Sequence, residues 1–371
     1  MTTPRRFADL RGGVRLAVDG VKGVTRIVEG VHGSVVRLAP PVGSHEQRPL
    51  RGISGLVYRS IHGTAGLVGL ALDSALAGVE QLLKNPDAGQ RSDGQRDSVP
   101  RDALVSALNG VVGDHLARTG NPLAIDMQLL RCKAKGPRPL LLIHGLCMNE
   151  QQWTRDGHDH GQALAASLGL SPIYLRYNTG LHIADNGAAL ASLLETTIAG
   201  WPVPVERFTI IGHSMGGLVA RNAVHHALAA GMAWPHLLKH LISLGTPYHG
   251  AALERGGNWL HRGLGVSPYL APFTRLSGLR SAGITDLRHG ENLLLPPEIT
   301  CFAVAGALGQ AAKGDWRGDG LVAVDSALGH STKPSKRLGI APSRTFVANG
   351  VGHLDLLSSE AVYARLRKWL A

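Results

Sequence analysis

The residues best suited to chemistry form a short pattern, Gly212-His213-Ser214-Met215-Gly216. The apolar run 208–211 before it predicts a strand, and the spacing of apolar residues over 217–230 predicts a helix. A serine on a sharp turn between a strand and a helix presents its hydroxyl at the end of the strand. Glycines on both sides leave room for the close approach of neighbouring backbone. We therefore expect Ser214 to be a nucleophile, flanked by the elbow glycines Gly212 and Gly216.

The residue after the serine has a role of its own. Backbone N–H groups at the start of a helix have no acceptor within the helix, and the helix dipole is positive there. We expect the N–H of Met215, at the positive end of the helix predicted over 217–230, to stabilise negative charge that develops beside Ser214.

Strands and helices must hold these residues. Short apolar runs predict strands over 139–144, 172–177, 208–211, 240–244, 301–305 and 344–348. Helical spacing predicts helices over 103–116, 186–198, 217–230 and 360–370. Such alternation is typical of an α/β fold, with a mostly parallel sheet flanked by helices.

Three segments together resemble the α/β-hydrolase superfamily, in particular bacterial serine lipases and esterases: the serine pattern, Leu142-Ile-His144-Gly145-Leu146, and Ser243-Leu-Gly-Thr246-Pro247-Tyr-His-Gly250. The resemblance covers 137–371, which we take as the catalytic domain. It implies the chain order serine, acid, histidine. His353, in a His-Leu-Asp segment similar to that of bacterial lipases, is thereby implied as the general base.

The resemblance also implies the remaining site residues. Asp319, in an Asp-Gly-Leu-Val segment, would orient the imidazole of His353, although Asp315 and Asp325 lie close in sequence. The N–H of Leu146 would form an oxyanion hole with that of Met215. Four other histidines have weaker claims to be the base, namely His144, His213, His249 and His330.

Neither a metal nor another cofactor is expected. Asp355 matches a calcium-ligand position of some bacterial lipases, but no second carboxylate matches. His158 and His160 lack further ligands, so we expect a solvated loop there. The long segment 251–291 is a lid candidate, with a plain helical cap as the alternative.

The chain before the hydrolase-like part has its own character. We expect a basic amphipathic helical extension over 1–84, a polar linker over 85–100 and a helical connector over 101–136. Residues 1–60 hold ten Arg and Lys against four Asp and Glu. Such an extension packs on the main domain or another copy, or contacts a membrane peripherally. The basic charge also permits nucleic-acid binding, but no nucleic-acid motif accompanies it.

Composition limits the class of protein. The 371 residues carry a formal net charge of +11 and 44% hydrophobic residues, enough for a large core. Three cysteines without a CxxC pair exclude a disulfide framework, namely Cys132, Cys147 and Cys301. The sequence shows no apolar stretch typical of a signal peptide or a transmembrane helix, so we expect a cytoplasmic protein, with peripheral membrane contact left open.

Together these features predict a serine esterase or lipase that acts on an ester or lipid substrate through an acyl-enzyme. Two alternatives stay open. Transfer of the acyl group to another alcohol would use the same residues, and a membrane- or partner-binding scaffold would keep them as a vestigial triad. The oligomeric state and the acyl chain length are not predicted.

Overall fold

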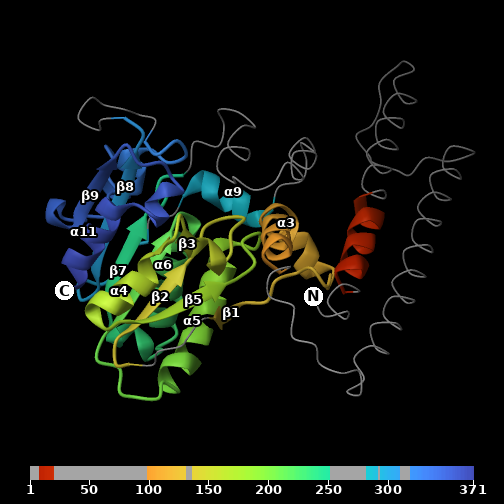
Figure 1. Cartoon of the computed structure of the whole chain (residues 1–371), viewed down its shortest axis with the longest axis horizontal. Helices are drawn as coiled ribbons and strands as arrows, with labels where there is room; N and C mark the ends of the chain where they lie inside the picture. The colour runs from red at the N-terminus through yellow and green to blue at the C-terminus, as the bar shows by residue number, and fades with distance from the viewer. Residues whose placement is uncertain (1–7, 21–97, 131–135, 251–280, 291–292, 310–317) are drawn as a thin grey trace, which may run out of the picture. The chain divides into compact units, whose positions relative to one another are not determined.

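The computed structural model describes residues 8–20, 98–130, 136–250, 281–290, 293–309 and 318–371, which are coloured in Figure 1. The chain divides into two compact units, Met1–Ser98 with Leu116–Ala124, and Val99–His115 with Ile125–Ala371. In the first unit, residues 8–20 are helical, and Asn121 Nδ2 donates to the carbonyl of Gly12 at 3.1 Å. The remainder of the extension expected over 1–84, and the expected linker up to residue 97, lie outside the described residues.

The second unit is built on a seven-stranded sheet. Its strand order is β1 (Gln128–Leu130), β5 (Ser171–Arg176), β2 (Pro139–Ile143), β6 (Phe208–His213), β7 (Leu238–Leu244), β8 (Thr300–Ala307) and β9 (Thr345–Asn349). All neighbours are parallel except β1 and β5, which are antiparallel. Gly212 is opposite both Ile143 and Ser243, so the strands around the serine end at one edge.

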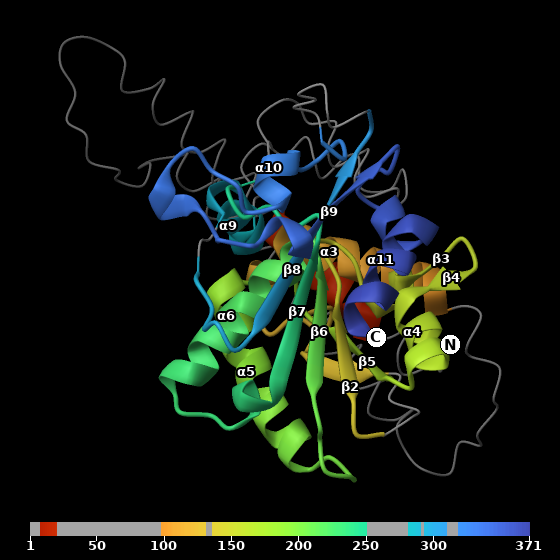
Figure 2. The same cartoon turned by 90° about the vertical axis from the view of Figure 1, so that its left-hand side faces the viewer.

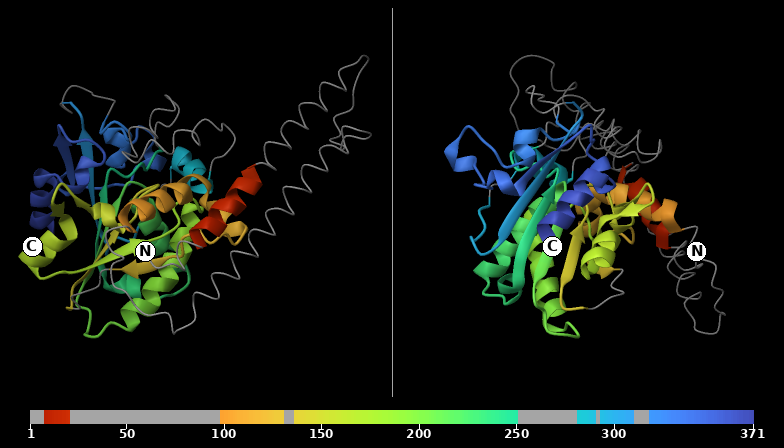
Figure 3. Two further views of the ribbon diagram at one scale, coloured as in Figure 1. Left: turned by 45° about the vertical axis from the view of Figure 1, so that its right-hand side comes forward. Right: turned by 60° about the vertical axis from the view of Figure 1, so that its left-hand side comes forward.

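Helices cover both faces of this sheet (Figure 2). On one face α5 (Ile183–Ala199) packs against α6 (Met215–Ala229), and on the other α4 (His160–Leu168) packs against α11 (Glu360–Leu370). In the right-hand view of Figure 3, the dark blue α11 lies beside the yellow-green α4. Side-chain oxygens of Asp159 and Ser359 cap the first turns of α4 and α11.

Shorter elements connect these layers. They are α3 (Ser98–Arg118), which is interrupted at Val112, α9 (Ala282–His289), α10 (Val324–Ala327), the hairpin of β3 (Thr154–Arg155) and β4 (His158–Asp159), and the 3-10 turns η1 (Glu150–Trp153), η2 (Trp234–Leu237), η5 (Pro334–Lys336), η6 (Pro342–Arg344) and η7 (Asp355–Leu357).

The core follows from the alternation of side chains along each strand. Every residue of β2 and of β6 is buried, as expected for central parallel strands. One cluster, which includes Leu142, Ile211, Leu244 and Val304, packs on the face that holds α4 and α11. Successive residues of β8 point to the other face, where a smaller cluster contains Ala303 and Ala305.

The predicted α/β fold with a mostly parallel sheet is confirmed, and each predicted strand matches one observed strand. The helix predicted over 360–370 has the bounds of α11. The sequence did not predict β1, which is only three residues long and partly exposed, or α4. None of the described helices is long and apolar enough to cross a membrane.

Candidate active site

Ser214 occupies the turn between β6 and α6 with a strained backbone. Its φ of 53° and ψ of −122° lie in a region that residues with a Cβ rarely adopt. Its N–H donates to the carbonyl of Leu244 at 2.8 Å, which fixes the turn to the neighbouring strand. The side chain is partly exposed at the carboxyl edge of the sheet.

Gly212 and Gly216 allow this turn to form. A Cβ on Gly212 would lie 2.5 Å from the backbone nitrogen of Gly217, and one on Gly216 would overlap the carbonyl oxygen of Ile143. Both contacts are shorter than any real Cβ tolerates against backbone. Only glycine therefore fits at these two positions, because neighbouring backbone approaches both of them closely.

His353 and Asp319 form a buried pair. Nδ1 of His353 lies 2.7 Å from Oδ2 of Asp319, and the two side chains are 7% and 0% exposed. Oδ1 of Asp319 accepts from the N–H groups of Leu321 and Val322 at 2.9 and 2.8 Å. The N–H of His353 also donates to the carbonyl of Asp319 at 3.1 Å. These bonds hold the carboxylate against the imidazole in one orientation.

Of the other two candidate acids, the structure describes Asp325, which does not take this place. Asp325 is exposed and lies 3.7 Å from His330. Asp315 lies outside the described residues. Asp319 follows β8, and His353 follows β9.

Contacts around Gly245 and His213 bring the pair to the serine turn. Gly245 follows Leu244, and a Cβ there would lie 3.1 Å from both Asp319 Oδ2 and His353 Nδ1. Nε2 of His213 donates to the carbonyl of His353 at 3.0 Å, and their rings are 4.8 Å apart. Ser214, Asp319 and His353 therefore gather where β6, β7, β8 and β9 end.

The two predicted oxyanion donors flank the same place. A Cβ on Gly145 would lie 3.0 Å from Cβ of Ser214, so the segment that carries Leu146 runs beside the serine. Within the described part of the chain, the backbone N–H groups of Leu146 and Met215 donate to no acceptor. Two free N–H groups on either side of a serine suit a developing oxyanion.

A second strained residue supports this segment. Cys147 has a φ of 61°, and the described part of the chain contains only two other residues besides glycine with positive φ, one of them Ser214. The N–H of Cys147 donates to Oγ1 of Thr179 at 3.0 Å. Both strained residues are thus sequence neighbours of a predicted donor, which is where strain tends to persist.

Two of the other histidines are buried and neutral. Burial lowers the pKa of His144 to about 4, while its Nδ1 donates to the carbonyl of Gly145 and its ring stacks on Tyr177 at 4.5 Å. Burial, and then the neighbouring His353, hold the pKa of His213 well below its usual range. Neither is placed to replace His353 beside Asp319.

The histidine pair 158 and 160 does not lie in a solvated loop, so that prediction was wrong. His160 is fully buried at the start of α4, its Nε2 donates to the carbonyl of Leu356 at 2.9 Å, and its Nδ1 lies 2.8 Å from Nε2 of His158. Asp355 is bound to Arg155 at 3.1 Å. The described residues contain no group of three or more metal-ligating side chains.

The lid candidate is described only at its end, since 251–280 and 291–292 lie outside the described residues. At that end α9 is anchored: Ser281 Oγ donates to the carbonyl of Gly110 at 2.6 Å. The N–H of Ile183 donates to Asp286 at 2.9 Å, and a Cβ on Gly283 would touch the side chain of Met215.

A sequence profile of the PGAP1-like alpha/beta domain family matches residues 189–265, from α5 through the serine turn and α6 to beyond β7. The strand order, the antiparallel edge strand, the serine turn and this match agree on one assignment. The described sheet has the α/β-hydrolase fold. The resemblance inferred from the sequence is confirmed at this level.

Solved structures similar to this chain include a lipase, BlEst2 of Bacillus licheniformis, at 18% identity and TM-score 0.47, covering 66% of this chain and 98% of that one. A lipase-esterase related protein from Clostridium acetobutylicum is 14% identical with TM-score 0.41, covering 65% and 98%. Phospholipase PlaB of Legionella pneumophila is 18% identical with TM-score 0.38, covering 52% and 45%. No curated protein matches the sequence.

Sequence reasoning missed the contacts that α3 makes with the segment after β2. Asp102 binds Arg176 at 3.2 Å, and Arg176 also binds Glu150 at 2.5 Å. Ser106 Oγ accepts from Asn149 Nδ2 at 3.2 Å, and Gly110 packs directly on Cys147. The expected connector is therefore a support beneath residues 146–150. Only the glycines of α3 hinted at a close approach.

Proposed function

We propose that this α/β hydrolase is a serine carboxylic-ester hydrolase, an esterase or lipase that acts on acyl esters. The observation that carries the proposal is the hydrogen bond from Nδ1 of His353 to buried Asp319. An N–H at Nδ1 leaves Nε2 of the neutral ring as the base. The strained Ser214 turn and the free N–H groups of Leu146 and Met215 support it.

In the proposed reaction, Oγ of Ser214 attacks the ester carbonyl carbon while Nε2 of His353 takes the hydroxyl proton. The N–H groups of Leu146 and Met215 donate to the oxyanion of the tetrahedral intermediate. The intermediate collapses as the bond to the alcohol oxygen breaks, and His353 gives its proton to that oxygen. The product is an acyl-enzyme on Ser214 and a free alcohol.

Water then attacks the acyl carbonyl carbon, with His353 again taking the proton. The bond to Oγ breaks, the proton returns to Ser214, and the carboxylic acid leaves. Asp319 stabilises the imidazolium in both halves and is not itself protonated. The reaction needs no cofactor beyond water.

Hydrolysis of p-nitrophenyl esters from acetate to palmitate tests the proposal, with the wild type compared with Ser214→Ala. We expect p-nitrophenol release that is lost in the variant, with a chain-length profile that separates an esterase from a lipase. A folded wild type that hydrolyses none of these esters would contradict the proposal.

A further inference from the structure

A second feature of the molecule is a stretch of chain without any acidic residue. Between Asp325 and Asp355 the sequence holds no Asp or Glu, but it holds four cations: Lys333, Lys336, Arg337 and Arg344. All four are exposed. Three of them lie within a single loop, residues 329–338, which we call the basic loop.

The basic loop has a closed and ordered base. The N–H of Leu338 donates to the carbonyl of Gly329 at 3.0 Å, so the two ends of the loop meet, and Leu338 is only 8% exposed. Between the ends, Pro334–Lys336 form a 3-10 turn, and Nε of Arg337 donates to the carbonyl of Ser331 at 2.7 Å. The cations therefore project from a fixed base, which lowers the entropy lost when they bind a partner.

The part of the chain that the structure describes does not neutralise these cations. Among the described residues no carboxylate lies within ion-pair distance of Lys333, Lys336 or Arg337, and the nearby Asp325 lies against His330 instead. By contrast, Arg176 binds Glu150 and Asp102, and Arg155 binds Asp355. The basic loop thus keeps positive charge that is available to an external anion.

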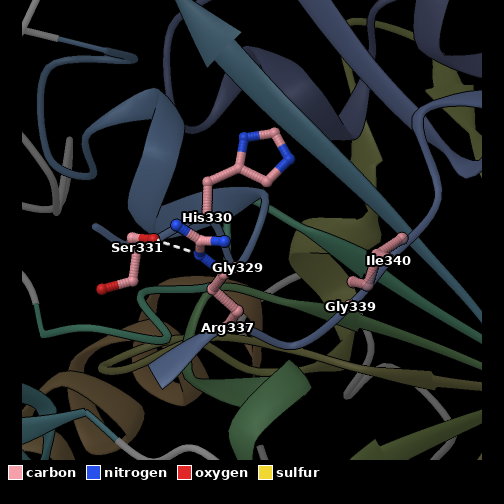
Figure 4. Close-up of a pocket in the computed structure, with 6 residues that line it drawn as sticks. All are labelled: Gly329, His330, Ser331, Arg337, Gly339 and Ile340. Carbon is pink, nitrogen blue, oxygen red and sulfur yellow. Dashed lines mark hydrogen bonds between the residues drawn. The ribbon is translucent and has the colours of Figure 1, made fainter. Parts of the chain in front are cut away.

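A hollow opens at the base of the loop (Figure 4). Its volume is about 400 Å³, and it is lined by Gly329, His330, Ser331, Arg337, Gly339 and Ile340. The dashed line in Figure 4 marks the bond by which Ser331 holds the guanidinium of Arg337 at this hollow. Arginine in a fixed orientation suits phosphate oxygens, which accept two parallel N–H bonds.

The basic loop starts at the same edge of the sheet as Ser214. Ser326, three residues before the loop, accepts at its Oγ from the N–H of His249, in the segment that follows β7. Oγ of Ser326 also donates to the carbonyl of Gly250 at 3.3 Å, in the same segment. A flat anionic layer bound by the loop would therefore meet the edge where the candidate nucleophile lies.

We propose that residues 329–338 bind the phosphate groups of an anionic lipid surface and bring this edge of the sheet to lipid esters. The consequence for catalysis rests on the proposed function, but the binding itself does not. It is also separate from any contact made by the N-terminal extension, because it assigns different residues.

Vesicle binding tests the proposal directly. The full chain with Ser214→Ala, which leaves the lipids intact, is mixed with vesicles of phosphatidylcholine alone or with added phosphatidylglycerol, and the partition coefficient is measured at several salt concentrations.

The loop variant carries Lys333→Gln, Lys336→Gln and Arg337→Gln. The control carries Arg207→Gln, Lys239→Gln and Lys368→Gln, and so loses the same charge; Arg207 and Lys239 lie where β6 and β7 begin, at the opposite edge.

We expect the loop variant to partition onto anionic vesicles about 100-fold more weakly, at about fivefold for each cation. The control should lose only a few-fold, and thermal denaturation should show that both variants are folded. Equal losses in both variants, or no loss in either, would overturn the proposal. Wild-type binding to phosphatidylcholine alone at the same strength would overturn it too.

Two further measurements separate the other outcomes. Inorganic phosphate should displace the chain from vesicles no better than chloride at equal ionic strength; stronger displacement would assign a discrete phosphate site in the hollow and contradict surface binding. Hydrolysis of a soluble ester by the loop variant with Ser214 intact should equal that of the wild type. If the wild type hydrolyses no ester but still shows the loop-dependent binding, the proposed function fails and the surface contact stands.

Discussion

Nε2 of His213 donates a 3.0 Å hydrogen bond to the carbonyl oxygen of His353, and the two rings lie 4.8 Å apart. His213 is the residue immediately before Ser214. One side chain therefore connects the turn of the proposed nucleophile to the backbone of the proposed base. The sequence alone identifies His213 only as the variable residue of the serine pattern, with a weaker claim than His353 to be the base.

This contact predicts that His213 is a positioning residue. His213→Phe keeps a ring but removes the donor, so we expect kcat to fall about 10- to 100-fold with KM nearly unchanged, because misplacement of the base by a fraction of an ångström slows proton transfer. His213→Gln keeps an N–H donor and should recover part of the loss. Steady-state kinetics on a soluble ester would refute this role if the Phe and Gln variants were equally active.

The burial of His144 and His160 predicts that the free energy of unfolding falls in mild acid. Burial lowers the pKa of His144 and of His160 from 6.5 to about 4. Between these values the unfolded chain binds protons that the folded chain does not, so the free energy of unfolding decreases as the pH drops from 6.5 towards 4. Each histidine contributes on the order of 3 kcal/mol to this loss, since one pKa unit equals about 1.4 kcal/mol.

Urea denaturation at pH 7 and pH 5 measures this effect. His160→Gln keeps a donor for the carbonyl of Leu356 and should make the free energy of unfolding less dependent on pH, whereas the same change at exposed His226 should not. A wild type with equal stability at the two pH values would show that these histidines are not held neutral.

The packing of α3 predicts that Gly110 controls the segment of Leu146. A Cβ at this position would overlap Sγ of Cys147, so Gly110→Ala must displace residues 146–148. We expect kcat to fall about tenfold or more, since removing a donor to the oxyanion costs about 10²–10³ in rate. KM should change little.

A second substitution distinguishes this effect from simple destabilisation. Cys147→Gly removes Sγ and suits the positive φ of 61°, so it should restore most of the activity of Gly110→Ala. Gly20→Ala, which would meet no atom within 4 Å, is the control for an added methyl group. A double variant as slow as Gly110→Ala alone would argue against the contact.

The strained backbone of Ser214 predicts that the inactive variant Ser214→Gly is more stable than the inactive variant Ser214→Ala. At φ 53° and ψ −122° a Cβ is strained but glycine is not. Ser214→Gly should therefore unfold at a higher temperature than Ser214→Ala, by a free energy of about 1 kcal/mol. Equal melting temperatures for the two inactive variants would mean that the turn is relaxed in solution.

Much of the sheet could be predicted because its central strands are buried on both faces. Buried parallel strands appear in a sequence as continuous apolar runs, as in β2 and β8. The three-residue, partly exposed β1 leaves no such pattern. The steric demand on Gly212 and Gly216 could also be predicted, because strand, turn and helix are adjacent in sequence.

The assignment of Asp319 and His353 needed the resemblance to a family. Without the family resemblance of the Asp-Gly-Leu-Val segment, the residue type alone does not distinguish Asp319 from Asp325, and only the tertiary fold brings residue 319 to residue 353. The same limit explains why the support of Cys147 by Gly110 and the burial of His160 were not predicted. In each case the partner lies far along the chain, at residues 147 and 356.

The central claim is that Asp319 and His353 activate Ser214. Labelling by a fluorophosphonate probe tests it most directly, because only an activated serine forms the covalent adduct, and mass spectrometry identifies the modified residue. We predict one adduct, on Ser214, that forms rapidly in the wild type and at least about 100-fold more slowly in His353→Ala and Asp319→Asn. A folded wild type that forms no adduct, or forms it at the same rate in all three proteins, would contradict the account.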